Sequence, residues 1–263
     1  STLNNLNDIS MHEDYGALLG YTQAELGSYF APYIQQLADK LGCSLDVAHA
    51  RLAQHYDGYR FSLGETHVYN PFSVLKALNH KQLQNYWFET GTPTFLVNLL
   101  REKQYPLPAL EGLQVDHSAF STFELEHLRP EALLFQTGYL TISDVEDDIY
   151  TLDYPNREVK RSFTKSLLFA TGVMANGTSS QVLRLSRYLQ DEDLDAFFET
   201  VTAIFASIPY DIQTKRDEAY YHTLFYLMLT ASGGNAQSSV LTCRGRIDMV
   251  ITYPEQVYII EFK

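Results

Sequence analysis

The residues with the clearest chemical potential are Asp248 and Glu261, near the C-terminal end of the 263-residue chain. Apolar, β-branched runs on both sides of Tyr253–Gln256 predict two strands joined as a hairpin. If Thr252 faces Val257 across that hairpin, Asp248 faces Glu261, and side-chain alternation places both carboxylates on one face. Like charges that face each other destabilise a sheet, so the pair needs a partner of opposite charge.

A divalent cation between the carboxylates of Asp248 and Glu261 would offset this repulsion, because Mg²⁺ and Mn²⁺ prefer oxygen ligands. Alternation places Arg246 and Lys263 opposite each other on the same face. The ammonium group of Lys263 would then stabilise negative charge that develops in a transition state. The alternative is a solvated sheet face with alternating charges, since an aspartate followed by Glu-x-Lys often occurs by chance.

Asp248, Glu261 and Lys263 resemble the signature of the PD-(D/E)XK nuclease superfamily, an aspartate early in one strand followed by Glu-x-Lys in the next. An upstream helix of that superfamily often adds a glutamate, and Glu218 is the match here. The resemblance implies that Asp248 and Glu261 bind the metal. It also implies that Lys263 stabilises the transition state and that Glu218 assists the metal or its water. Alternatively, Glu218 is an ordinary acidic residue in a first helical turn, where the helix dipole favours it.

Most of the remaining chain resembles bacterial AAA-ATPase-like proteins that carry a C-terminal PD-(D/E)XK nuclease-like domain. This resemblance rests on segments that occur in order along the chain, namely Leu3–Ser10, Tyr56–Phe61, Tyr69–Phe72, Tyr86–Phe95, Gln136–Leu140 and Leu152–Glu158. The phosphate-binding motif Gly-x-x-x-x-Gly-Lys-Ser/Thr does not occur in the sequence. Because the chain also ends on Lys263, we expect a fragment that lacks the P-loop and the end of the nuclease domain.

The resemblance and the local signals together predict an α+β fold, mostly α, in three parts. Residues 1–104 would form the helical C-terminal part of an AAA-ATPase-like domain, similar to an ATPase lid. Residues 105–207 would form a winged-helix-like and helical linker region. Residues 208–263 would form the N-terminal half of a PD-(D/E)XK (restriction-endonuclease-like) domain with an αβββ core.

Local signals place several of these elements. A capping box at Thr22–Glu25 and the pair Asn70–Pro71 predict helix starts. A second hairpin is expected from residues 139–142 and 149–152. Its turn, Asp144–Asp148, is acidic and would repel phosphate, so we favour a structural or inter-domain role for this unit over DNA reading.

Two further polar residues have competing interpretations. A helix expected over residues 215–231 places Glu218, His222 and Phe225 on one stripe. His222 is either a partner of the metal ligands or a histidine satisfied within a packed face, and we favour packing. Arg60 is either a nucleotide sensor or part of an aromatic-rich turn that packs in the core, and we favour the core.

Charge and hydropathy restrict the function classes. The net charge of −13, from 19 basic and 32 acidic residues, argues against a broad nucleic-acid surface, since Lys and Arg supply most of that affinity. Nucleic acid would bind this chain weakly and locally, and protein partners are compatible with it. No apolar run is long enough for a membrane span and the start is not a signal peptide, so a cytoplasmic protein is expected. Cys43 and Cys243 are expected to be free buried thiols.

Two functions fit these observations. The first is an ATPase-coupled nuclease that uses Mg²⁺ or Mn²⁺ to hydrolyse phosphodiester bonds of nucleic acid, with ATP bound only in the full-length protein and this fragment inactive. The alternative is a non-catalytic ATP-dependent switch or protein-interaction module with a relic nuclease domain. The acidic charge favours the second, whereas the complete Asp…Glu-x-Lys set favours the first. We favour the enzyme.

Overall fold

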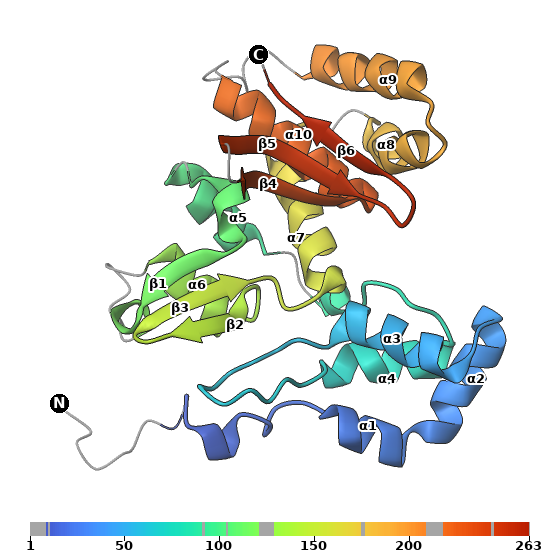
Figure 1. Ribbon diagram of the computed structural model, residues 1–263, viewed down its shortest axis with the longest axis vertical. Coiled ribbons are helices and arrows are strands. Elements are labelled where there is room, and N and C mark those ends of the chain that lie inside the picture. Colours follow the sequence, from blue (N-terminus) through green and yellow to red (C-terminus); the bar gives the residue numbers. More distant parts are fainter. Residues whose placement is uncertain are drawn as a thin grey trace. The chain divides into compact units, whose positions relative to one another are not determined.

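The computed structural model describes residue 9 and residues 11–90, 93–103, 105–120, 129–174, 177–208, 218–242 and 245–262. The chain folds as two compact units. The first comprises residues 1–91 and 110–160, and the second comprises residues 92–109 and 161–263. Helices predominate in both units, and each contains one three-stranded antiparallel sheet (Figure 1). The mostly helical α+β class predicted from the sequence is therefore confirmed.

Two helices at the start of the first unit, α1 and α4, begin where their capping residues predict. The helical elements of this region are η1 (Glu13–Tyr15), α1 (Gln23–Tyr29), α2 (Ala31–Leu41), α3 (Leu45–Tyr56), α4 (Pro71–His80) and η2 (Trp87–Thr90). The Thr22 hydroxyl accepts the Glu25 N–H at 3.2 Å, and the Glu25 carboxylate accepts the Thr22 N–H at 2.9 Å. The Asn70 side chain accepts the Ser73 N–H at 3.2 Å. Both predicted helix starts are confirmed.

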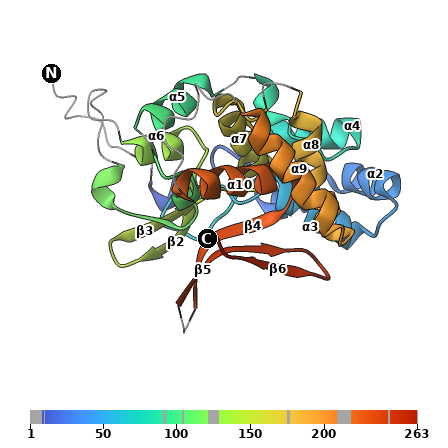
Figure 2. The same cartoon turned by 90° about the horizontal axis from the view of Figure 1, so that it is seen from above.

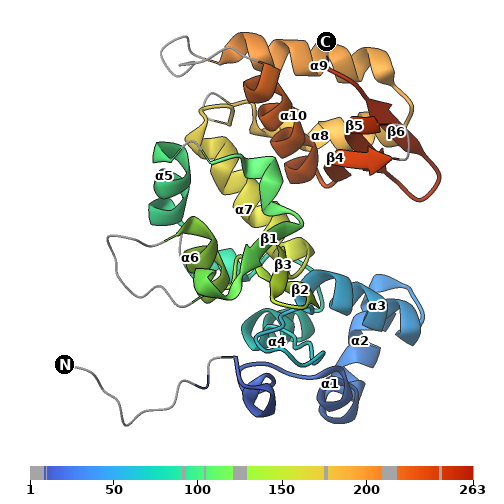
Figure 3. The ribbon, with the colours of Figure 1, turned by 60° about the vertical axis from the view of Figure 1, so that its left-hand side comes forward.

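Helices α2, α3 and α4 pack side by side around an apolar core (Figure 3). Ile34 and Leu37 of α2 and Leu52 of α3 are fully buried in this core. Tyr56, at the end of α3, is also fully buried, and its hydroxyl donates to the Gln84 carbonyl at 2.8 Å. Burial of aromatic and aliphatic side chains supplies most of the stability of such a bundle.

The sheet of the first unit is larger than the sequence predicted. The elements of this part are β1 (Leu113–Asp116), η4 (His117–Ala119), α6 (Pro130–Gln136), β2 (Thr141–Glu146) and β3 (Ile149–Asp153). The predicted hairpin is β2–β3, and its turn contains Asp147 with a positive φ of 53°. Strand β1 pairs with β3 and gives the order β1-β3-β2. The sequence did not predict β1, because four residues carry little periodic signal.

Asp153, at the end of β3, makes stability depend on pH. Burial and the Glu111 carboxylate raise its pKa to about 6, whereas the Tyr154 N–H and Lys160 lower it. An acid with a raised pKa binds more protons when folded, so its contribution to stability is present near pH 4 and is lost as the pH rises through about 6.

Replacing Asp153 with asparagine should therefore stabilise the protein above pH 6. The amide oxygen can still accept the Tyr154 N–H, which lies 2.6 Å from Asp153 Oδ1. We expect the free energy of unfolding to rise by about 1 to 2 kcal/mol at pH 7.5 and to vary less between pH 4 and 6. Urea denaturation of wild type and variant across this pH range measures both changes. If the free energy of unfolding varies with pH in the variant as it does in wild type, a group other than Asp153 controls that dependence.

The second unit contains the segment expected to resemble a nuclease. Its elements are α5 (Thr94–Glu102), the greater part of α7 (Arg157–Ala170), α8 (Ser179–Gln190), α9 (Leu194–Ser207), α10 (Glu218–Ser232), β4 (Asn235–Thr242), β5 (Gly245–Thr252) and β6 (Val257–Ile260). The short helix η3 (Leu107–Leu110) lies where the chain passes between the units. The strands form an antiparallel sheet in the order β4-β5-β6. Helix α10 followed by three strands matches the predicted αβββ order, and β4 begins earlier than the strands expected after residue 240.

The predicted division into residues 1–104, 105–207 and 208–263 rests on the family resemblance. Which domain of that family each range corresponds to stays a prediction. The compact units group the residues differently, since residues 110–160 belong with the N-terminal helices. Cys43 is a half-buried free thiol, and Cys243 lies outside the described residues. No helix in the described part of the chain is both long and apolar enough to cross a membrane.

Candidate active site

Strands β5 and β6 form the hairpin predicted from the sequence. Thr252 pairs with Val257, as predicted, and the ladder continues to the pair Met249–Ile260. The next pair in this register would be Asp248 with Glu261. Strand β6 ends at Ile260, so the ladder stops one pair before the two carboxylates.

A hydrogen bond of the Asp248 side chain marks where the ladder ends. Asp248 Oδ2 accepts the backbone N–H of Phe262 at 2.9 Å. The residue after Glu261 therefore bonds to a side chain of β5. Lys263, the predicted catalytic lysine, lies outside the described residues. The hydrogen bond holds the Phe262 backbone beside the aspartate.

The two faces of this sheet differ in burial. Met249 and Ile251 of β5 are fully buried. Helices α8, α9 and α10 lie on one side of β4–β6, and no described element of this unit covers the other side (Figure 2). Because side chains alternate along a strand, Asp248 points away from the face that contains Met249. It is half-buried, whereas Glu261 is exposed.

Helix α10 packs against β4 and reaches the backbone of β5, the strand that carries Asp248. His222 Nε2 lies 3.1 Å from the Asp248 carbonyl oxygen and 3.5 Å from Ser238 Oγ. The His222 ring meets the Phe262 ring edge-on, with centroids 5.0 Å apart and planes at 84°. His222 thus contacts the backbone of the aspartate and packs on an aromatic ring, which agrees with the favoured packing interpretation.

Glu218 is the first residue of α10 and is exposed. It lies one helical turn before His222, a rise of about 6 Å along the helix axis. Helix α10 therefore begins one turn before the residue that contacts the Asp248 backbone. The proposed assistance of Glu218 to a metal ion stays a prediction.

Strand β4 adds a feature that the sequence did not predict. Ser239 has a φ of +59°, a conformation that residues other than glycine rarely adopt. The ladder between β4 and β5 contains the pairs Ser238–Met249 and Val240–Ile247 but no pair between them. The interruption therefore lies beside Asp248. The Ser239 hydroxyl accepts a hydrogen bond from Arg246 Nη2.

The donor set suits a hard divalent cation. Asp248 and Glu261 offer carboxylate oxygens, of which Asp248 Oδ2 accepts the Phe262 N–H. The described ranges contain no group of three or more His, Cys, Asp or Glu side chains that could hold a metal ion. Mg²⁺ usually binds through one or two carboxylates together with waters and substrate phosphates. Two carboxylates therefore fit Mg²⁺ better than an ion that requires a full protein cage.

Arg60, in the first unit, has a structural role. Its side chain is 8% exposed. Nε donates to the Gly64 carbonyl at 2.8 Å, and Nη2 donates to the Leu63 carbonyl at 2.7 Å. The Arg60 N–H donates to the Thr141 hydroxyl at 2.7 Å. The guanidinium group thus holds its own loop, as in the core interpretation favoured from the sequence.

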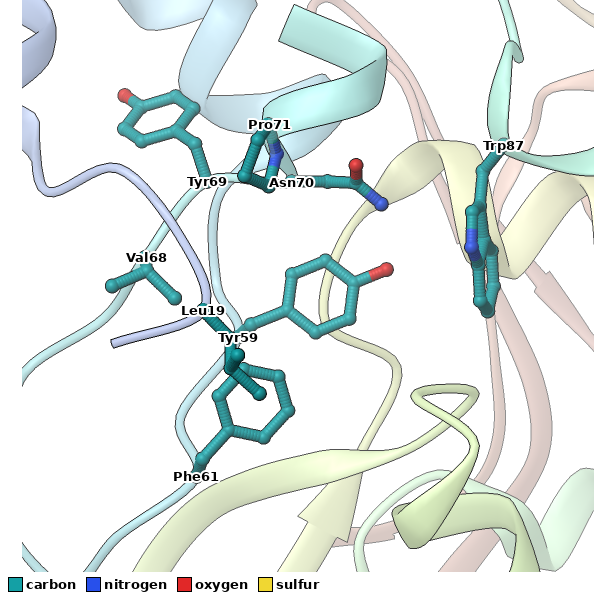
Figure 4. A pocket seen from close by; sticks show the side chains of 8 residues that line it. All are labelled: Leu19, Tyr59, Phe61, Val68, Tyr69, Asn70, Pro71 and Trp87. Carbon is teal, nitrogen blue, oxygen red and sulfur yellow. The ribbon is translucent and has the colours of Figure 1, made fainter. Parts of the chain in front are cut away.

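A pocket of about 220 Å³ lies close to this loop, lined by Leu19, Tyr59, Phe61, Val68, Tyr69, Asn70, Pro71 and Trp87 (Figure 4). Six of these eight residues come from three of the segments that resemble the ATPase-like family, and Leu19 and Val68 lie outside them. Burial raises the pKa of Tyr59, and the nearby amides of Asn70 and Asn156 partly offset that rise. Tyr59 and Phe61 stack with ring centroids 5.7 Å apart. These segments therefore form an aromatic cluster within the first unit.

Comparisons with known proteins bear on the C-terminal segment. Over 271 residues the chain is 39% identical to the "Uncharacterized protein in vnfD 5'region" of Azotobacter chroococcum mcd 1. The alignment covers 100% of this chain and 50% of that protein, so the chain spans about half the length of its relative. No solved structure matches the chain. Residues 216–263 match the family described as "PD-(D/E)XK nuclease superfamily", and this matched segment contains α10, β4, β5 and β6.

Proposed function

We propose that the full-length protein is a metal-dependent nuclease that hydrolyses phosphodiester bonds through Asp248, Glu261 and Lys263. One observation supports this site above the others. The hydrogen bond from the Phe262 N–H to the Asp248 carboxylate joins the two halves of the Asp…Glu-x-Lys set, which the sequence separates by 12 intervening residues. The segment that contains it also matches the nuclease superfamily.

Asp248 and Glu261 would hold Mg²⁺ or Mn²⁺, which when bound makes water a better nucleophile and neutralises phosphate charge. The Phe262 N–H orients the Asp248 carboxylate, and His222 contacts the Asp248 carbonyl. Lys263 would stabilise the negative charge that develops on the phosphate oxygens. The family resemblance would give Glu218, at the exposed start of α10, a role in assisting the metal or its water.

The charge of the chain limits how nucleic acid would bind. With a net charge of −13, long-range attraction to phosphate is unfavourable. Binding would depend on a few cations close to the carboxylates and would weaken steeply with salt. Protein partners could supply further affinity.

We also propose that ATP regulates the nuclease in the full-length protein. The segments similar to AAA-ATPase-like proteins support this, and the nucleotide would bind outside this chain because its sequence has no P-loop. The Arg60 guanidinium donates to carbonyls of its own loop, so another residue would have to sense the nucleotide.

Both proposals can be tested with the full-length protein and end-labelled single-stranded DNA, double-stranded DNA and RNA. Cleavage should require Mg²⁺ or Mn²⁺, stop in EDTA and return when the metal is restored in excess. The rate should differ between samples with and without ATP. Equal cleavage in EDTA would contradict metal dependence. An absence of cleavage from every substrate would favour the non-catalytic switch or interaction module.

A further inference from the structure

Arg246 shares the open face of the sheet with Asp248. It lies two residues earlier in β5, and two strand residues span about 6.8 Å and return the side chain to the same face. The Arg246 side chain is exposed, whereas Met249 on the other face is fully buried. A cation therefore lies at one side of the carboxylates, on the surface where a substrate would approach them.

Ser239 orients this cation. Arg246 Nη2 donates to the Ser239 hydroxyl, and Ser239 adopts the left-handed conformation that interrupts the β4–β5 ladder beside Asp248. Backbone strain of this kind occurs where the surrounding structure enforces it, often at functional sites. One N–H of the guanidinium group is used by Ser239, and a guanidinium has five.

No carboxylate neutralises Arg246 within the described part of the chain. The ion pairs of described residues include His12–Asp14, Lys160–Glu111 and Arg187–Asp191, and Arg246 takes part in none of these. A planar guanidinium with free N–H groups matches the oxygens of a phosphate and can bind two of them at once. In a chain with an excess of 13 negative charges, such a cation beside the carboxylates has few competitors for a phosphate.

We propose that Arg246 binds a backbone phosphate of the nucleic-acid substrate, adjacent to the phosphate that is cleaved. This assignment rests on the proposed nuclease function and adds a substrate-binding residue to it. Arg246 would hold the strand in register with Asp248, while Ser239 keeps the guanidinium group above the sheet. If the role of Arg246 were purely structural, replacing it would have an effect only through the loss of its hydrogen bond to Ser239.

Three variants of the full-length protein separate these roles. Arg246→Gln removes the charge, and Arg246→Lys keeps the charge but loses the planar set of guanidinium N–H donors. Ser239→Ala removes the hydroxyl that orients the guanidinium group. Arg187→Gln is the matched control, because Arg187 is an exposed cation of α8 that pairs with Asp191 at 3.3 Å. Helix α8 lies on the covered side of the sheet.

Binding of a fluorescein-labelled oligonucleotide is measured in EDTA at several salt concentrations, so that the result does not depend on catalysis. Removing one phosphate contact should reduce the slope of log K against log salt by about 0.7 for a single strand or 0.9 for a duplex. The ratio of the Arg246→Gln Kd to the wild-type Kd should therefore grow about threefold between 200 and 50 mM salt. Arg246→Lys should keep most of the slope, and Arg187→Gln should keep all of it.

Steady-state cleavage with Mg²⁺ gives the second measurement. Arg246→Gln should raise KM more than it lowers kcat, and Ser239→Ala should raise KM less. The proposal is overturned if Arg246→Gln binds with the wild-type slope and KM, or if it changes no more than Arg187→Gln. If the wild-type protein cleaves nothing, the proposed function fails, and the salt dependence of binding still decides the role of Arg246.

Discussion

Replacing Asp248 with asparagine is expected to abolish nucleic-acid cleavage by the full-length protein, with a loss of rate on the order of a thousandfold or more. Asparagine has nearly the same shape, and its amide oxygen can still accept the Phe262 N–H that now bonds to Asp248 Oδ2 at 2.9 Å. The local structure should therefore persist. What the variant loses is the negative charge that attracts a divalent cation.

Cleavage assays measure the loss of rate, and calorimetric titration with Mn²⁺ measures the loss of metal affinity. Glu255→Gln is a suitable control, because Glu255 is an exposed carboxylate in the turn of the same hairpin and the charge change is identical. The control should retain wild-type rate and metal affinity. Equal cleavage by wild-type protein and Asp248→Asn would remove the proposed site.

Replacing Gly58 with alanine is expected to lower the free energy of unfolding by about 3 kcal/mol or more. Gly58 has a φ of +99°, and an added Cβ would lie 2.0 Å from the Pro155 carbonyl oxygen. Both neighbouring residues are held in place. The Asp57 carbonyl accepts the Asn156 amide at 3.0 Å, and the Tyr59 N–H donates to the Val68 carbonyl at 3.2 Å.

Chemical denaturation of the variant and wild-type proteins measures this loss. Gly27→Ala provides the control, because Gly27 lies inside α1 and an added Cβ would meet no atom within 4 Å. That variant should be as stable as wild type or more stable by up to about 1 kcal/mol. If Gly58→Ala proves as stable as Gly27→Ala, the close approach of Gly58 to Pro155 does not occur in solution.

The candidate site shows where local pattern is sufficient and where it is not. Alternation around Tyr253–Gln256 correctly predicted the β5–β6 hairpin and its register from Thr252 paired with Val257. The same pattern could not show that β6 ends before Glu261. Next to this position the Asp248 carboxylate accepts the Phe262 backbone N–H, a contact that no periodicity encodes.

Arg60 gives a second example from the first unit. The sequence offered two roles for it, nucleotide sensing and packing within an aromatic-rich turn, and favoured packing without showing which groups the guanidinium would bond. The structure places its donors on the carbonyls of Leu63 and Gly64. Backbone carbonyl positions depend on how the loop folds, and residue types alone do not determine them.

The sequence by itself determined the helix starts, the two hairpins, the mostly helical class and the residues that resemble a nuclease signature. These features depend on neighbouring residues, whose capping groups and alternation act within a few positions. Only the tertiary structure decided that β1 joins the first sheet, that His222 contacts the strand of Asp248, and that Ser239 adopts a positive φ beside it. These features depend on contacts between residues far apart in the chain, where packing and hydrogen bonding override local preference.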